Sequence, residues 1–227
     1  MSYTVNETIA SSNRSADGEK RRFSITDCTP VIFADVYLEE VNMAIWQREL
    51  NRELKDAADA FSASHPRFEC GLIVSPDNAL DTLKKEIPKL PAALAEDVTD
   101  LVDMFCSLFE LTSTGMRLAV LDKAMCPRFH VDHVPCRLVT TYKGIATQWL
   151  PHTVVDRSRL GPGSNGQADH TSGLYKAAGD VQQLTSGDVA LLKGEGWPSN
   201  ENAGLVHRSP TVESGASRLF FTLDFST

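Results

Sequence analysis

The feature that most constrains the fold is a change of pattern near Gly115, where helical periodicity gives way to short strand-like runs. Beyond this residue no long helical pattern recurs, and Gly and Pro separate the apolar runs. Several short strands with turn signals between them are typical of a β-sandwich or a β-barrel. The strands we expect span residues 116–121, 137–142, 147–150, 181–184, 189–193, 205–208 and 218–225.

The half of the chain before Gly115 has mainly helical periodicity. Apolar residues recur at helical spacing over 38–63 and again over 92–111. Between them, an apolar run over 68–74 predicts a strand, and Ser75-Pro76 starts a short helix that continues to about Glu86. Helices first and strands later predict an α+β fold.

The length of the chain predicts its domain organisation. A chain of 227 residues suits one domain. We expect residues 1–25 to be a flexible leader and residues 26–227 to be a single domain, with 26–115 as a mainly helical buttress and 116–227 as a β-barrel.

The leader contains no apolar core of signal-peptide length, and no apolar run approaches the roughly 18 residues that span a bilayer. We therefore expect a cytoplasmic protein without a membrane partner. The net charge of −8 argues against a nucleic-acid partner, because neutralising phosphates needs a concentrated basic surface. The odd number of cysteines favours free thiols or metal ligands over disulfides.

A candidate metal site lies in the second half. His130-Val131-Asp132 is followed 75 residues after Asp132 by His207. Two imidazoles and one carboxylate can occupy one face of a metal ion and leave the other face open for substrate and oxygen. Non-heme Fe(II) oxygenases use this arrangement, whereas a structural zinc site closes all four positions.

The order of segments in this half resembles that of the double-stranded β-helix oxygenases that depend on Fe(II) and 2-oxoglutarate. In that family a His-x-Asp motif precedes a strand, a Gly-Asp turn such as Gly187-Asp188 introduces a later strand, and a basic residue follows the distal His. The resemblance implies a jelly-roll, cupin-like barrel and assigns His130, Asp132 and His207 to the metal. It also assigns Arg218, 11 residues after His207, to the distal carboxylate of 2-oxoglutarate.

Two alternatives remain for the arginines. Arg137 is a second candidate for binding the co-substrate if its side chain faces the site. Arg218 also has a structural alternative, which is a local ion pair with Glu213 or Asp224.

Over most of residues 30–225 the chain is similar to an uncharacterised bacterial family, domain-of-unknown-function family 1826. Long segments carry the likeness, among them Met125-Cys126-Pro127-Arg128-Phe129-His130-Val131-Asp132 and Leu191-Leu192-Lys193-Gly194-Glu195-Gly196-Trp197-Pro198. The family implies no established activity. Its association with zinc-homeostasis gene neighbourhoods makes zinc an alternative metal.

The residues themselves offer a zinc site as well. Cys126, His130, His133 and Cys136 place two thiols and two imidazoles within eleven residues, and soft thiolates with imidazoles favour zinc. Strand alternation opposes this set, because its members converge only if the chain turns near Val134-Pro135. A mixed set of Cys126 with His130, Asp132 and His207 is a further alternative.

Other residues are pocket candidates. Trp149, Trp197 and Asn200 lie near the ends of expected strands and would combine an aromatic wall with amide donors, and Glu195 is a candidate acid. The polar segment 156–173 is either a lid over the barrel or a disordered insertion. The leading hypothesis is an Fe(II)/2-oxoglutarate oxygenase that oxidises a small molecule or a protein side chain. The alternative is a zinc-binding protein of metal homeostasis without turnover.

Overall fold

The computed structural model describes residues 21–226, and within this range the chain has a mixed α+β fold. A seven-stranded sheet has the order β1-β2-β8-β5-β10-β4-β3. Neighbouring strands pair antiparallel except for β1 and β2, which are parallel. Its strands are β1 (Phe23–Asp27), β2 (Val41–Trp46), β3 (Glu69–Val74), β4 (Thr114–Leu121), β5 (Cys136–Lys143), β8 (Val189–Lys193) and β10 (Arg218–Phe225).

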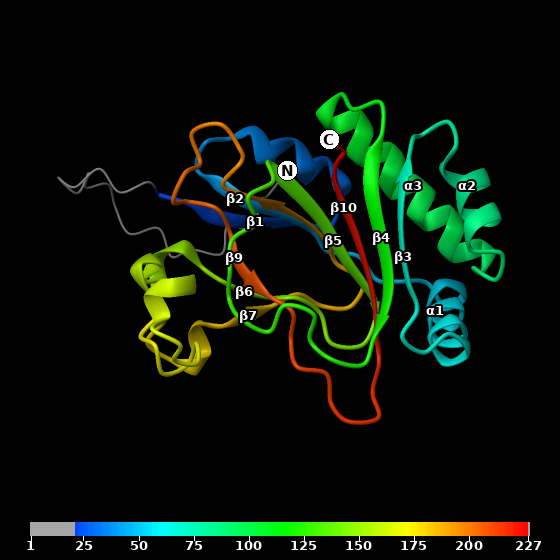
Figure 1. Ribbon diagram of the computed structural model, residues 1–227. Coiled ribbons are helices and arrows are strands. Elements are labelled where there is room, and N and C mark those ends of the chain that lie inside the picture. The colour runs from blue at the N-terminus through cyan, green and yellow to red at the C-terminus, as the bar shows by residue number, and fades with distance from the viewer. Residues whose placement is uncertain (1–20, 227) are drawn as a thin grey trace.

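A small antiparallel sheet lies on one side of the large one (Figure 1). It has the order β7-β6-β9 and consists of β6 (Gln148–Leu150), β7 (Gln182–Gln183) and β9 (Val206–Arg208). The facing surfaces of the two sheets share an apolar core that includes Met43, Val139, Trp149 and Phe220.

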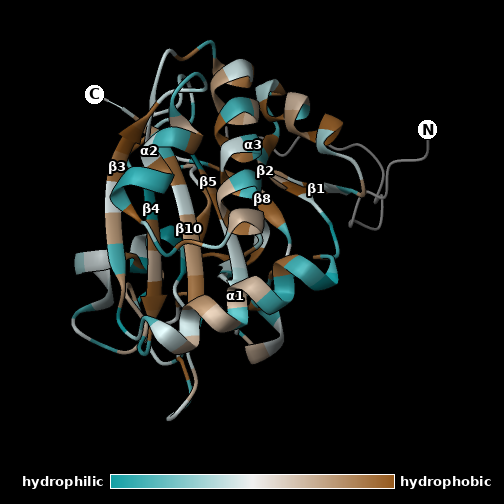
Figure 2. Ribbon diagram, turned by 90° about the vertical axis from the view of Figure 1, so that its right-hand side faces the viewer, coloured by the Kyte–Doolittle hydropathy of each residue, from teal (hydrophilic) through white to brown (hydrophobic). Residues whose placement is uncertain are grey.

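The helices cover the opposite face of the large sheet (Figure 2). They are the 3-10 helix η1 (Pro30–Tyr37) and the α-helices α1 (Arg52–Ser64), α2 (Ala79–Glu86) and α3 (Ala92–Phe109). Alternate residues of the central strands, such as Leu138 and Phe221, face these helices and build the larger core with Phe61 and Leu101. In the part of the chain that the structure describes, no helix is long and apolar enough to cross a membrane.

Most expected elements are confirmed, and one is wrong in part. Periodicity over 38–63 predicted a single helix, but Val41–Trp46 is strand β2 and the helix starts only at Arg52. Strand β2 is buried on both faces, so its apolar run lacks the polar alternation that marks a half-exposed strand. Asn51 begins the helix by accepting a hydrogen bond from the Leu54 amide at 2.8 Å. The segment 26–115 contributes strands β2 and β3 to the large sheet in addition to its helices, and its description as a mainly helical buttress stays a prediction.

The beginning of the chain gives a second correction. Residues 1–20 of the expected leader lie outside the described residues, but Phe23–Asp27 forms β1 at the edge of the large sheet. Regular structure thus begins before residue 26. The division into a leader and one domain otherwise stays a prediction.

The polar segment 156–173 is ordered. It folds into short 3-10 turns, η3 (Arg157–Arg159) and η4 (Gly161–Ser164). Its Asp169 is buried, pairs with Arg128 and Arg208 at 3.2 and 3.3 Å, and accepts the Phe129 amide at 2.9 Å. Leu160 and Leu174 pack with Leu150 and Val206 on the face of the small sheet that points away from the large sheet. The segment is therefore an outer support of the small sheet.

Candidate metal centre

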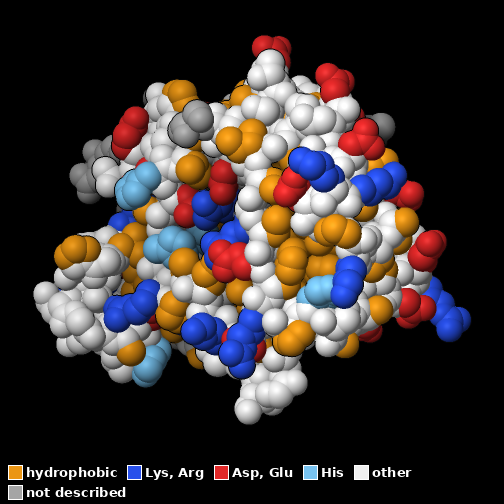
Figure 3. All heavy atoms as spheres, turned by 45° about the vertical axis from the view of Figure 1, so that its right-hand side comes forward, with side chains coloured by type: hydrophobic (Ala, Val, Ile, Leu, Met, Phe, Trp, Pro, Cys, Tyr) orange, Lys and Arg blue, Asp and Glu red, His pale blue; other side chains and the backbone are white. Residues whose placement is uncertain are grey.

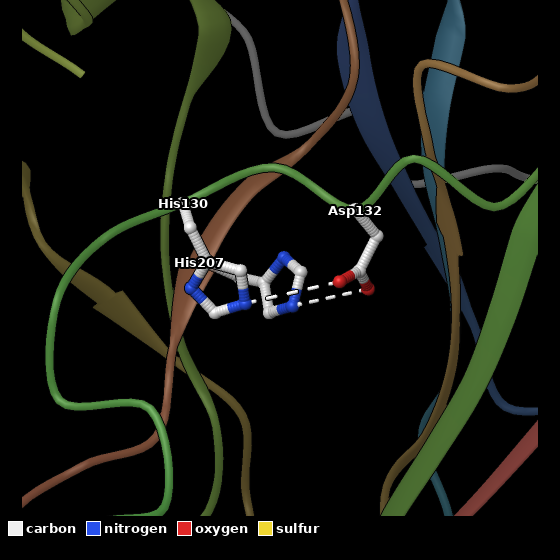
Figure 4. Close-up of side chains that lie close together, drawn as sticks. All are labelled: His130, Asp132 and His207. Atoms are coloured by element: carbon white, nitrogen blue, oxygen red, sulfur yellow. Dashed lines mark ion pairs between the residues drawn. The ribbon is translucent and has the colours of Figure 1, made fainter. Parts of the chain in front are cut away.

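Three side chains with metal-ligand chemistry meet between the two sheets. His207 lies on β9, and His130 forms an isolated antiparallel bridge with it, with both backbone N–H···O distances at 3.0 Å. Asp132 follows two residues later on the same loop as His130. One ligand atom from each of the three residues lies within 4.8 Å of the others (Figure 4). Within residues 21–226 this is the only such group of three or more His, Cys, Asp or Glu side chains.

Backbone carbonyls orient both imidazoles. The Nδ1 atom of His130 lies 2.9 Å from the Arg128 carbonyl oxygen, and Nδ1 of His207 lies 3.2 Å from that of Leu205. A carbonyl oxygen can only accept, so Nδ1 donates in each ring, and in the neutral form of the ring Nε2 is then the atom with a free lone pair. Burial lowers the pKa of His207 to about 4, so this ring is neutral at physiological pH.

The arrangement of the three groups fits a bound cation. His130 Nε2 lies 3.8 Å from Asp132 Oδ1, and His207 Nε2 lies 3.4 Å from Asp132 Oδ2. These separations are longer than a good hydrogen bond. With neutral imidazoles, the three groups offer converging lone pairs that a metal ion would be able to bind.

Arg137 on β5 holds the carboxylate of Asp132. Its Nη1 donates to Asp132 Oδ2 at 2.8 Å, while Nε and Nη2 donate to Asp224 Oδ1 and Oδ2 at 2.7 and 3.1 Å. The guanidinium thereby connects a candidate ligand to strand β10. Sequence considerations made Arg137 a candidate for the co-substrate; in the structure it lines the cavity, but three of its five N–H donors already bind the two carboxylates.

A cavity of about 420 Å³ opens beside the three residues, between the large and the small sheet. On the surface, histidine, basic and acidic side chains gather around a hollow (Figure 3). The large sheet supplies Arg117, Arg137, Val139, Arg218, Phe220, Thr222 and Asp224, and the other side supplies Met125, Cys126, His130, Thr147, His207, Arg208 and Ser209.

Arg218 is a fully buried cation on this cavity, with 0% of its surface exposed. Its guanidinium donates to the hydroxyls of Thr147 at 2.8 Å and of Thr141 and Ser209 at 3.1 Å. The guanidinium carbon of Arg218 lies 4.1 Å from the centre of the Phe220 ring. Burial lowers the pKa of Arg218 to about 10, which leaves it charged at neutral pH.

Neither local carboxylate neutralises Arg218. Asp224 binds Arg137 instead, Glu213 is exposed, and within residues 21–226 no carboxylate lies within 4.0 Å of the Arg218 guanidinium. A buried guanidinium surrounded only by hydroxyls is suited to binding an anion from the cavity. Sequence reasoning found Arg218 but missed its hydroxyl partners. Strand alternation from Arg137 places Thr141 on the same face, whereas Thr147 and Ser209 lie in loops and gave no signal.

The alternative zinc ligands do not come together. Cys136 faces the helix-side core and is fully buried there, and burial raises the pKa of its thiol far above the usual range. His133 is exposed and lies 3.7 Å from Glu195. Cys126 lines the cavity but is not part of the three-residue group. The expected turn does not bring Cys136 to the site, because β5 begins at this residue and directs its side chain to the opposite face.

The pocket candidates from the sequence do not line the metal cavity either. Trp149 packs in the core between the sheets, and Glu195 contributes its backbone, which donates to the Asp132 carbonyl at 2.8 Å. Trp197 and Asn200 line a different cavity, of about 220 Å³, together with Arg22 and Lys193. Trp197 and Asn200, but neither Trp149 nor Glu195, therefore lie together at a cavity that is separate from the candidate metal centre.

A family described as protein of unknown function, DUF1826, matches residues 27–224. The chain belongs to this family. The match confirms the family resemblance that the sequence segments indicated, and it includes all three candidate ligands and Arg218. No curated protein matches this DUF1826 member.

Solved structures resemble this DUF1826 member at low identity. A dioxygenase for auxin oxidation in rice is 11% identical, with a TM-score of 0.46 over 81% of this chain and 73% of that one. A Pseudomonas putida prolyl-4-hydroxylase is 11% identical, with a TM-score of 0.45 over 87% and 98%. HygX from Streptomyces hygroscopicus, with nickel and 2-oxoglutarate bound, is 11% identical, with a TM-score of 0.43 over 86% and 85%. At such values the function has to be argued from the site itself.

Proposed function

We propose that this protein is a non-heme Fe(II)- and 2-oxoglutarate-dependent oxygenase built on a double-stranded β-helix. The observation that carries the proposal is the pairing of an open three-residue ligand set with a buried, unneutralised arginine on one cavity. A facial set of two His and one carboxylate leaves coordination positions free for co-substrate and oxygen. The facing sheets that enclose this cavity are consistent with such a β-helix.

The side chains at the cavity would have three separate roles: binding the metal, binding the co-substrate and orienting a ligand. His130, Asp132 and His207 would hold the iron, and Arg218 would bind the distal carboxylate of 2-oxoglutarate in a pocket of hydroxyls. When bound, iron and 2-oxoglutarate together supply the oxidising power through oxidative decarboxylation of the co-substrate. Arg137 would keep the carboxylate of Asp132 in place, because it is itself fixed by Asp224.

Iron is favoured over a closed zinc site by the ligand set. Three ligands with no thiolate among them leave the fourth position of a tetrahedral zinc site unfilled by protein. Zinc or nickel would still bind the same three residues, because affinity rises along the divalent series, so the metal found after purification does not by itself define the physiological one.

The remaining part of the cavity would hold the substrate. Met116, Arg117 and Met125 line it alongside the ligands, a combination of apolar surface and one basic group that fits a small molecule or a protein side chain. We propose no nucleic-acid partner, given the net charge of −8.

The test is an anaerobic titration of the metal-free protein with Fe(II), with and without 2-oxoglutarate, monitored by the metal-to-ligand charge-transfer absorption. We expect the band with the wild type and no band with His130→Ala. Arg218→Gln should retain Fe(II) but bind 2-oxoglutarate about 10–100-fold more weakly, because a charge-assisted contact is lost. The exposed Arg159→Gln serves as the matched control and should behave as the wild type.

Two outcomes would contradict the proposal. Full retention of the band in His130→Ala would remove this residue from the metal site. Stoichiometric zinc that Fe(II) cannot replace, with no band under any condition, would favour the metal-homeostasis alternative at the same three residues.

A further inference from the structure

Two buried cations line a cavity that is separate from the candidate metal centre. Lys193, at the end of β8, is 1% exposed, and Arg22, just before β1, is 4% exposed. Both line the cavity of about 220 Å³ that also contains Trp197 and Asn200. None of the residues lining this cavity lines the cavity at the metal centre.

Lys193 is held by few contacts. Its ammonium donates to the Leu38 carbonyl at 2.8 Å and lies 4.9 Å from the centre of the Trp197 ring. An ammonium has three N–H donors, so this contact leaves capacity for a ligand. Burial and the neighbouring charge of Arg22 lower the pKa of Lys193 to about 8, which leaves it mostly charged at neutral pH.

Arg22 is fixed by the loop that follows β8. Its Nε donates to the side-chain oxygen of Asn200 at 2.8 Å, and its other nitrogens donate to the backbone oxygens of Arg21 and Ser199 at 2.8 and 3.3 Å. Asn200 is itself buried and donates to the Gly194 carbonyl at 2.9 Å. The guanidinium is thus oriented by neutral groups.

Among the residues that the structure describes, neither cation at this cavity is directly paired with a carboxylate, although the more distant charges of Glu39 and Glu40 act to raise the pKa of Lys193. Within residues 21–226, no carboxylate lies within 4.0 Å of the Lys193 ammonium or the Arg22 guanidinium. Glu39, the acidic residue among those lining the cavity, is exposed at its rim. Two like charges held near each other in the interior oppose folding, and an anion bound between them would offset this cost.

We propose that this cavity binds a small anion carrying at least two negative charges, as phosphate or carboxylate groups. Lys193 would supply a compact point charge and Arg22 a planar fork, a combination that suits oxyanions. The rings of Tyr37 and Trp197, with centres 5.4 Å apart, would form the wall against which the rest of the ligand packs. The proposal does not depend on the oxygenase activity, because the two cavities share no residue.

Isothermal titration calorimetry of the full-length protein tests the site, with inorganic phosphate and citrate as the two probes and chloride at matched ionic strength as the reference. We expect the wild type to bind at least one probe. Lys193→Gln and Arg22→Gln should each weaken binding by about tenfold or more. The exposed Lys176→Gln is the control and should bind as the wild type does, and Arg218→Gln, which removes the other proposed anion site, should retain the binding that Lys193→Gln weakens. Whichever probe binds more tightly identifies the chemistry of the anion.

Either of two results overturns the proposal. The first is no binding of either probe by the wild type at millimolar concentration. The second is binding that Arg218→Gln removes and Lys193→Gln retains, which would place the anion at the metal centre. Because Arg22→Gln tests the same site from a different segment of the chain, misfolding of the Lys193 variant, detected by circular dichroism, leaves the test intact.

Discussion

At the scale of single residues, the buried cations of this protein fall into two kinds. Arg48 donates to both carboxylate oxygens of Asp97, at 2.6 and 2.9 Å, and Arg137 pairs with Asp132 and Asp224. Arg218 and Lys193 are more deeply buried than these two half-buried arginines, and within the part of the chain that is described their hydrogen-bond partners are all neutral. The unneutralised charges both face cavities, which is where a ligand can balance them.

The buried charge of Lys193 should reduce stability in a pH-dependent manner. Its pKa of about 8 in the folded protein lies below the ordinary value of 10.5, so between these values the unfolded chain binds the proton more tightly. The stability of the wild type relative to Lys193→Met should therefore increase by about 1–3 kcal/mol as pH rises from 7 to above 10. Urea unfolding of both proteins across this range measures the difference, and a constant difference would contradict a lowered pKa.

Part of the candidate metal centre could be located from the sequence because its candidate ligands follow recognisable local patterns, and the structure brings these three residues together. His130, Asp132 and His207 share a motif and a spacing, and Arg218 follows at a compatible distance. The carboxylate partner of Arg137 could not be found this way, because Asp224 meets it only through the pairing of β5 with β10. The alternative zinc set failed for a related reason. Cys136 is near the motif in sequence, but it begins β5 and its side chain faces the core on the helix side of the large sheet.

At the scale of elements, the turn after β8 supports the loop that carries the ligands. The Gly194 and Glu195 amides donate to the Pro135 and Asp132 carbonyls at 2.9 and 2.8 Å. A Cβ atom at Gly194 would overlap the Val134 carbonyl oxygen, and one at Gly196 would overlap that of His133. Two backbone segments thus approach more closely than any side chain allows, which explains the glycines on both sides of Glu195.

Gly194→Ala should therefore disturb the metal centre without touching a ligand. We expect a loss of about 1–3 kcal/mol in the free energy of unfolding, because the added methyl group forces the two loops apart. Metal affinity should fall by about 10–100-fold, as when a group that orients ligands is changed. Urea unfolding and metal titration measure the two effects. Gly179→Ala is the matched control, since its Cβ would meet nothing within 4 Å. An equal loss in both variants would show that the turn after β8 does not support the loop that carries the candidate ligands.

The elements that the sequence predicted best are those with a one-sided environment. Helix α3 has a buried stripe with polar residues opposite, and its expected range of 92–111 agrees closely with Ala92–Phe109. Strand β2 is covered on both faces, so its pattern fits a helix as well as a strand. The polar sequence of 156–173 suggested a lid or a disordered insertion. In the structure its buried carboxylate, Asp169, fixes the segment by binding Phe129 and Arg208, which lie 40 and 39 residues away in the sequence. Such distant pairs leave no local signal.

At the scale of the whole molecule, the candidate metal centre is one of the places where the two sheets are connected. His207 belongs to the small sheet, whereas Asp132 connects through Arg137 to Asp224 on the large sheet. A metal ion bound by His207 and Asp132 would complete this chain of contacts from β9 to β10. Metal binding should for this reason stabilise the fold as a unit rather than order a single loop.

We expect the thermal midpoint of the metal-free protein to rise when Fe(II) is added anaerobically. Free metal at one hundred times its dissociation constant stabilises the folded state by about 2.7 kcal/mol. For a chain of this size that corresponds to a shift of about 5–10 °C, measurable by circular dichroism. Arg137→Gln keeps all three ligands but loses the link to β10, so the shift at the same metal concentration should shrink. His207→Ala should abolish it, and the exposed His170→Ala should not change it. An undiminished shift in His207→Ala would mean that the ion binds elsewhere and that the two sheets are joined without it.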